Sequence, residues 1–70
     1  MDLTLCRMAR SALDWSAQTL ADNAGVSVRT VLRFEAGETV ALGTVEGLRS
    51  ALVQGGVLFV ETDGKRGVLV

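Results

Sequence analysis

The chain has 70 residues, a formal net charge of −1, one cysteine and no histidine. A chain of this length forms one small domain whose core is near the lower limit for independent folding. The composition excludes an internal disulfide, a zinc site, a membrane span of roughly 20 apolar residues and a strongly basic protein that coats nucleic acid without sequence preference.

The first helix is predicted from about Leu5 to Leu13, where apolar residues recur at helical spacing. Thr4 precedes this stretch, and its hydroxyl is expected to cap the helix. Asp14 follows it, at a position where helices usually stop with glycine or asparagine. Trp15, the single tryptophan, is expected to anchor the junction of the first two helices.

Two short helices are predicted next, over about 17–24 and 28–36, with Gly25 between them. Ser16 and Ser27 stand directly before them, where hydroxyl side chains cap helix N-termini. Gly25 adopts a positive φ at no steric cost, as a sharp turn between helices requires. This layout is typical of a helix-turn-helix, which places its second helix in the DNA major groove.

A fourth helix of about nine residues is predicted from Val45, with Thr44 as its expected cap. Gly47 inside it costs about 1 kcal/mol relative to alanine, so this helix should depend on tertiary packing. The pair Gly55-Gly56 is expected to end it.

A β-hairpin is predicted at the C-terminal end, because residues 57–62 and 67–70 are mostly apolar or β-branched and Asp63-Gly64 is a strong turn signal. The first strand lacks the alternation of a hairpin with one wet face, so both faces should be covered. A lone hairpin is marginal in water, and pairing with a second subunit would cover the free face. Packing on its own helices alone is the alternative. The residues expected at the dimer contact are Val57, Leu58, Phe59, Val60, Val68, Leu69 and Val70.

Several spaced positions form a wider pattern: Leu-Asp-Trp-Ser at 13–16, Leu-Ala at 20–21, Gly-Val-Ser at 25–27, Val31, and Phe-Glu-Ala-Gly at 34–37. With this pattern the chain resembles the lambda-repressor/Cro-type helix-turn-helix regulators, also called the xenobiotic-response-element family. The hairpin is similar to that of small bacterial and phage members. The resemblance implies a bundle of five or four helices, operator binding as a dimer, and no cofactor. For this chain we expect a mainly α fold, a four-helix bundle with a C-terminal β-hairpin.

The third helix carries the candidate DNA contacts. Arg29 and Arg33 lie four residues apart and share a face. An arginine can hold guanine O6 and N7 together, and a threonine can meet a thymine methyl group, although a merely solvated helix face is the alternative. The residues expected to contact bases are Val28, Arg29, Thr30 and Arg33. Those expected to contact phosphates, beyond any capping role, are Ser16, Gln18 and Ser27.

The resemblance also implies an ion pair between Arg10 of the first helix and Glu35 near the end of the third. Such a pair would be partly buried and would hold the recognition helix in place. Cys6 is expected to be a small apolar core residue, with redox sensing as an alternative that would need an activated thiolate.

The residues therefore favour a homodimeric, sequence-specific DNA-binding regulator, a repressor or autoregulator that reads an inverted-repeat operator in double-stranded DNA. Residues 1–54 would form the DNA-binding domain and residues 55–70 the dimerisation hairpin. The alternative is a protein-interaction module with the same fold, which the near-neutral charge and Ala17, in place of a phosphate-contacting glutamine, favour. An enzyme is not expected without histidine or a paired-carboxylate cleft. No metal, cofactor, small-molecule ligand or membrane is expected, and the lack of cysteine pairs fits the cytoplasm.

Overall fold

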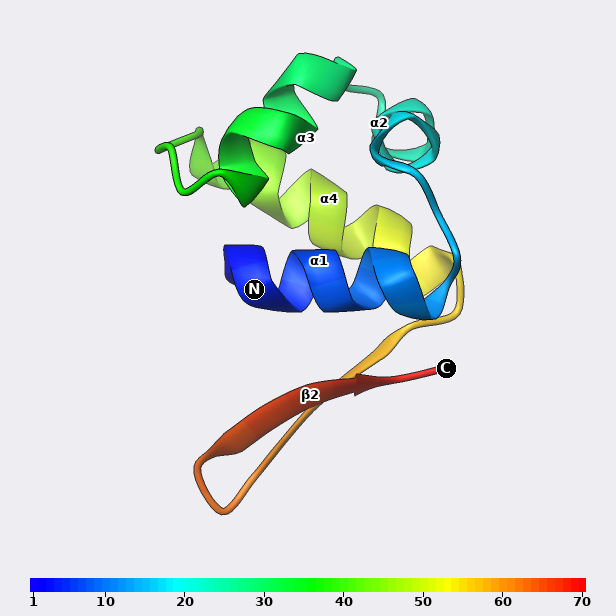
Figure 1. The fold of residues 1–70 in the computed structure, drawn as a ribbon, viewed down its shortest axis with the longest axis vertical. Coiled ribbons are helices and arrows are strands. Elements are labelled where there is room, and N and C mark those ends of the chain that lie inside the picture. The colour runs from blue at the N-terminus through cyan, green and yellow to red at the C-terminus, as the bar shows by residue number, and fades with distance from the viewer.

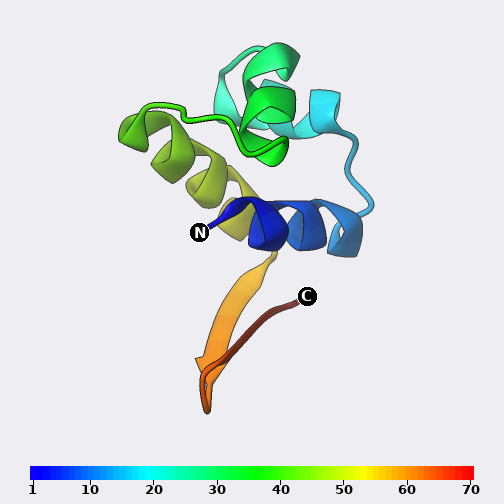
Figure 2. The ribbon, with the colours of Figure 1, turned by 60° about the vertical axis from the view of Figure 1, so that its left-hand side comes forward.

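Four helices followed by a β-hairpin make up the chain in the computed structural model, which describes residues 1–70. The helices are α1 (Leu3–Ala12), α2 (Ala17–Ala24), α3 (Val28–Glu35) and α4 (Leu42–Gln54), and the antiparallel strands are β1 (Leu58–Thr62) and β2 (Lys65–Leu69). In Figures 1 and 2 the helices gather into one bundle, and the hairpin extends from it on the side of α1. The predicted mainly helical class with a C-terminal hairpin is confirmed.

The core lies where the four helices meet, and it is small. Alanines among its larger aliphatic side chains let the helices approach one another closely. Trp15 and Phe34 are half-buried and pack against it. The buried residues are Cys6, Ala9, Leu20, Ala21, Val31, Leu48, Ala51, Leu52 and Val57. A core of this size leaves a narrow margin of stability, so a single defect should have a large effect.

The predicted start of the first helix is wrong. The helix begins at Leu3, and Asp2 caps it by accepting the backbone N–H of Leu5 at 2.9 Å. Thr4 therefore lies inside the first turn, because a carboxylate two residues upstream satisfies the free N–H group instead. Asp14 follows the helix with φ 59°, in the left-handed region that short polar side chains tolerate.

The serine caps of the next two helices are confirmed. Ser16 accepts the backbone N–H of Thr19 at 3.0 Å, and Ser27 accepts that of Thr30 at 3.2 Å. Between the helices Gly25 has φ 72°, the left-handed conformation that the turn requires. The signals for both helices are local ones, and α2 has the predicted bounds while α3 ends one residue early.

The fourth helix is longer than predicted, with 13 residues, and Thr44 is not its cap. It begins at Leu42 after Ala41, whose side chain makes no capping hydrogen bond. The backbone N–H groups of Thr44 and Val45 both donate to the carbonyl of Ala41, at 3.0 and 3.2 Å. Since Ala41 and Leu42 are exposed, water reaches the remaining free N–H groups and no side-chain cap is needed.

The predicted hairpin turn is confirmed, because Asp63 and Gly64 both have positive φ values, 51° and 74°. The expectation that Val57 faces a second subunit is wrong. Val57 precedes β1 and is only 3% exposed, because the chain leaving α4 carries it into the core of its own bundle.

The two faces of the hairpin differ in what covers them. Phe59 pairs with Val68, and both are half-buried against the chain's own core, so these two predicted dimer residues face the helices. Leu58 pairs with Leu69 on the other face, and these residues are 60% and 57% exposed. Val60 shares this outer face, since side chains alternate along a strand. We name Leu58, Val60 and Leu69 the outer hairpin face.

Gly47 within α4 and Gly55 directly after it should respond oppositely to alanine. A Cβ atom on Gly55 would lie 2.7 Å from two ring carbons of Trp15, so Gly55→Ala should lower the free energy of unfolding by about 1–3 kcal/mol. A Cβ atom on Gly47 would meet nothing within 4 Å, so Gly47→Ala should raise it by about 0.5–1 kcal/mol through helix propensity. Urea unfolding measures both changes. Equal changes in the two variants would contradict the packing of Trp15 on Gly55.

Candidate nucleic-acid interface

The outward face of α3 is formed by residues three and four apart, on the side opposite buried Val31. We name this set, which includes the residue that follows the helix, the α3 outer face. Its exposed members are Arg29, Leu32, Arg33 and Ala36. The face thus presents two guanidinium groups and one large apolar side chain.

The two arginines of the α3 outer face differ in their partners. Arg29 is exposed and forms no ion pair within the chain, so its guanidinium is free to bind a ligand. The Nε atom of Arg33 donates to Oε1 of Glu38 at 3.2 Å, and both side chains are about half exposed. An exposed pair of this kind contributes little, so a competing anion could displace Glu38.

The other two predicted base contacts lie at the margins of this face. Val28 is half-buried and packs against the core. Thr30 is half-buried, and its hydroxyl oxygen lies 3.0 Å from that of Ser27. Both side chains therefore help to hold the first turn of α3, and less of each is accessible than of Arg29.

The three predicted phosphate contacts are exposed at the starts of α2 and α3. The hydroxyl oxygens of Ser16 and Ser27 each cap one backbone N–H group. The other N–H groups of each first turn have no partner within the helix and can bind an anion. Gln18 donates from Nε2 to Oδ1 of Asp22 at 2.8 Å. That carboxylate places negative charge beside Gln18, and a phosphate would have to compete with it.

An ion pair joins the start of the fold to the end of α3. The Nε and Nη2 atoms of Arg10 donate to the two carboxylate oxygens of Glu35, at 2.9 and 2.8 Å. The Nη1 atom of Arg10 donates to the carbonyl of Trp15 at 3.0 Å, and the thiol of Cys6 donates to Glu35 at 3.3 Å. The side chain of Glu35 is 7% exposed and that of Arg10 is 23% exposed. This two-pronged pair fixes α3 against α1.

The same contacts shift the ionisation of the groups involved. Burial acts to raise the pKa of Glu35, but hydrogen bonds from Arg10 and Cys6 and the positive charge of Arg10 outweigh it, so the pKa is lowered. Burial, the hydrogen bond to Glu35 and the charge of Glu35 raise the pKa of the Cys6 thiol to about 12. Cys6 is thus a protonated core residue, and the activated thiolate that redox sensing would need is not present.

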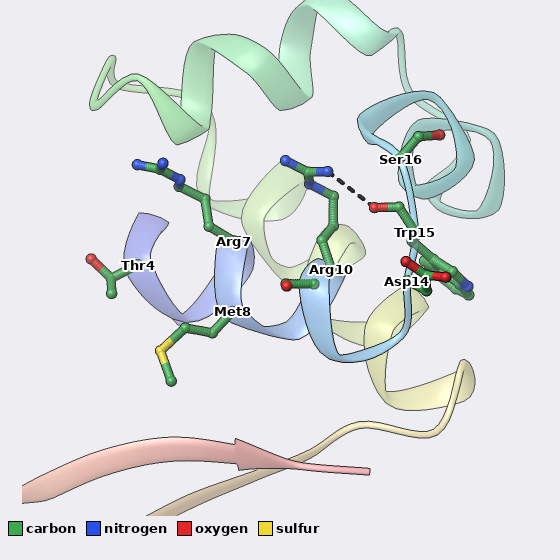
Figure 3. Close-up of a pocket in the computed structure, with 8 residues that line it drawn as sticks. Thr4, Arg7, Met8, Arg10, Asp14, Trp15 and Ser16 are labelled. Atoms are coloured by element: carbon green, nitrogen blue, oxygen red, sulfur yellow. Dashed lines mark hydrogen bonds between the residues drawn. The ribbon is translucent and has the colours of Figure 1, made fainter.

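An open groove of about 840 Å³ runs along α1 to the start of α2. Figure 3 shows Arg7 and Arg10 extending from α1 in the same direction, with Ser16 above Trp15 at the other end. Arg10 is paired with Glu35, so the groove offers the positive charge of Arg7 and hydroxyl groups beside the α2 N-terminus, which are groups suited to contacting phosphate. Its lining residues are Thr4, Arg7, Met8, Arg10, Ser11, Asp14, Trp15 and Ser16.

Leu32 and Ala36 are the members of the α3 outer face that were not predicted as contacts, and Leu32 is the larger of the two. It is 53% exposed, whereas Val31 is buried and Phe34 is half-buried. The signal was available, because Leu32 lies three residues after Arg29 and so shares its face. The helix is short, and its apolar residues alone do not reveal which of them faces outward.

Comparison with known proteins leaves the site to be judged on its geometry. No family model matches the chain, and no curated protein matches it. None of its helices combines the length and apolar character that crossing a membrane requires. No three histidine, cysteine, aspartate or glutamate side chains come together in a way that could hold a metal ion.

Proposed function

We propose that the chain is a sequence-specific DNA-binding regulator that inserts α3 into the major groove. The observation that carries this proposal is the α3 outer face, where unpaired Arg29 and weakly paired Arg33 project from a serine-capped helix held by the Arg10–Glu35 pair. Arginine is the side chain that most often reads guanine in the major groove, through a pair of hydrogen bonds. A helix fixed to its own core presents these groups with little loss of entropy on binding.

Binding-site selection from random double-stranded DNA, run at two salt concentrations, tests this proposal. We expect an enriched inverted repeat whose half-sites lie about 34 Å apart, one turn of the double helix. Affinity should fall steeply as salt increases, because each phosphate contact releases counterions. A library without any enriched sequence would contradict the proposal.

The outer hairpin face supports the expected homodimer. Leu58 and Leu69 are opposite each other and mostly exposed, and burying a leucine contributes about 1.5–3 kcal/mol. In a two-fold dimer both subunits carry the substitution, so two leucines are lost from the contact. Leu58→Lys should therefore weaken the dimer at least about 100-fold. Sedimentation equilibrium measures this change. Val53→Lys, on the exposed side of α4, is the matched control and should leave the mass at two chains.

Glu38→Gln should tighten DNA binding about threefold, because it frees Arg33 and removes a negative charge beside the phosphates. The measurement is a titration of the selected DNA site at one salt concentration. Glu46→Gln, on an exposed part of α4, makes the same change of charge elsewhere and should have less effect. Weaker binding by the Glu38 variant would mean that Glu38 positions Arg33 and does not compete for it.

A protein-interaction module is the second candidate, favoured by the acidic partners of Gln18 and Arg33 and by the net charge of −1. Such a module would use the α3 outer face to dock on another regulator or on a polymerase. The salt dependence separates the two candidates, because a module that does not contact phosphates releases no counterions.

A further inference from the structure

We infer that Leu32 reads the 5-methyl group of a thymine beside the base that an arginine of α3 contacts, and so sets part of the sequence specificity. This inference rests on the proposed function, which says only that α3 enters the major groove. It goes further by naming one chemical group of the DNA and the side chain that recognises it.

The position of Leu32 is the first observation. It is 53% exposed on the α3 outer face, while its neighbour Val31 is fully buried. Leu32 therefore takes no part in the core, although an exposed position of a short helix is normally polar. Removing its side chain should cost the fold little, and a role outside the core is the reason we infer for an apolar residue here.

The spacing of the side chains is the second observation. Residues three apart on a helix have Cβ atoms about 5–6 Å apart, and bases along one strand are about 3.4 Å apart. When Arg29 holds one base, Leu32 thus reaches the next base or the one after it. A leucine reads DNA only through an apolar contact, because it has no hydrogen-bond donor or acceptor.

The chemistry of the major groove then selects the ligand. Among the four bases, thymine alone presents an apolar group there, its 5-methyl, and the other edges are hydrogen-bond donors and acceptors. Leu32 against such a polar edge would displace water without replacing its hydrogen bonds. Leu32 lies on the same helix face as Arg29 and Arg33, whose guanidinium groups favour a polyanion over an apolar protein surface at this place.

The test replaces single thymines of the selected site with deoxyuridine, which removes one methyl group and keeps the hydrogen-bonding edge. In each half-site, one replacement should weaken binding by the unaltered protein roughly fourfold, the effect of exposing one buried methyl-sized group. Leu32→Ala changes both subunits, so it should bind the thymine site about fourfold more weakly per half-site, or about 16-fold in all, and should not distinguish thymine from deoxyuridine at that position.

Val53→Ala is the matched control, since it shortens an exposed apolar side chain on α4 and should retain the discrimination. Thermal unfolding of both variants checks that the fold is intact. The inference is overturned if the unaltered protein binds all deoxyuridine sites equally well, or if Leu32→Ala still discriminates as strongly as the unaltered protein. Either result leaves DNA binding in place, whereas failure to select any site contradicts the proposed function itself.

Discussion

Arg10→Met should lower the free energy of unfolding by about 3 kcal/mol, because it leaves the carboxylate of Glu35 buried without its cation. A domain of this size has about 4–10 kcal/mol in total, so the loss is a large share of it. The melting temperature should fall by roughly 15 °C. Methionine keeps most of the volume of the arginine stem, so the change tests the charge and its hydrogen bonds more than the packing. Urea unfolding followed by circular dichroism measures the difference.

Two further variants isolate the cause of this loss. Arg33→Met breaks the other arginine–glutamate pair of α3, which is exposed, and should cost less than about 1 kcal/mol. Adding Glu35→Leu to Arg10→Met removes the unpaired carboxylate and should recover part of the stability. If Arg10→Met and Arg33→Met were equally destabilising, the burial of the Arg10–Glu35 pair would not be the reason.

The pH dependence of the same variants has a definite sign. The pKa of Glu35 in the folded protein is lowered from 4.5, so its stabilising contribution is complete above that value and is lost as the pH falls through the folded-state pKa. Hydrogen bonds from the Leu5 N–H and from Arg66 lower the pKa of Asp2, which acts in the same direction. In Arg10→Met, burial without the cation raises the pKa of Glu35, and its protonation at acid pH relieves the cost. The deficit of this variant should therefore begin to shrink above pH 4.5, where Glu35 of the variant is protonated, and should shrink further below 4.5, where the unaltered protein loses the contribution of the ion pair.

Local signals in the sequence were sufficient for the middle of the fold. Ser16 and Ser27 are the cap residues that the two central helices use, and Asp63-Gly64 supplies the two positive φ values of the hairpin turn. In each case the residues that determine the geometry are neighbours in the chain. Arg10 and Glu35 were expected only from the family resemblance, because nothing local joins residues so far apart.

The remaining errors arose where tertiary structure decides. Two residues near the start of α1 can serve as caps, and Asp2 is the one used, where it also pairs with Arg66 of the hairpin. Val57 belongs to an apolar run that reads as strand, but the exit from α4 carries it into the core. The spacing of three residues from Arg29 places Leu32 on the same face of α3, and its exposure then depends on which neighbours the helix packs against.

Arg29→Ala should weaken binding to the selected DNA site by about 1–3 kcal/mol per half-site, which is about 5-fold to about 150-fold for each. Arg29 has no partner within the chain, so its replacement leaves the fold unchanged and removes only what it contributes to the complex. A base contact also predicts relaxed specificity at one position of each half-site, whereas a phosphate contact would weaken all sequences alike and reduce the salt slope.

Repeating the site selection with Arg29→Ala distinguishes these two roles, because it reports specificity and affinity together. Lys65→Ala removes the same charge at the tip of the hairpin and serves as the control for net charge. If the two variants bound the site equally well, the α3 outer face would not be the surface that reads DNA. Arg29 is the one arginine of that face with no competing carboxylate, so it is the side chain best placed to bind DNA. Equal binding by the two variants would therefore favour the protein-interaction module as the function of this exposed helix.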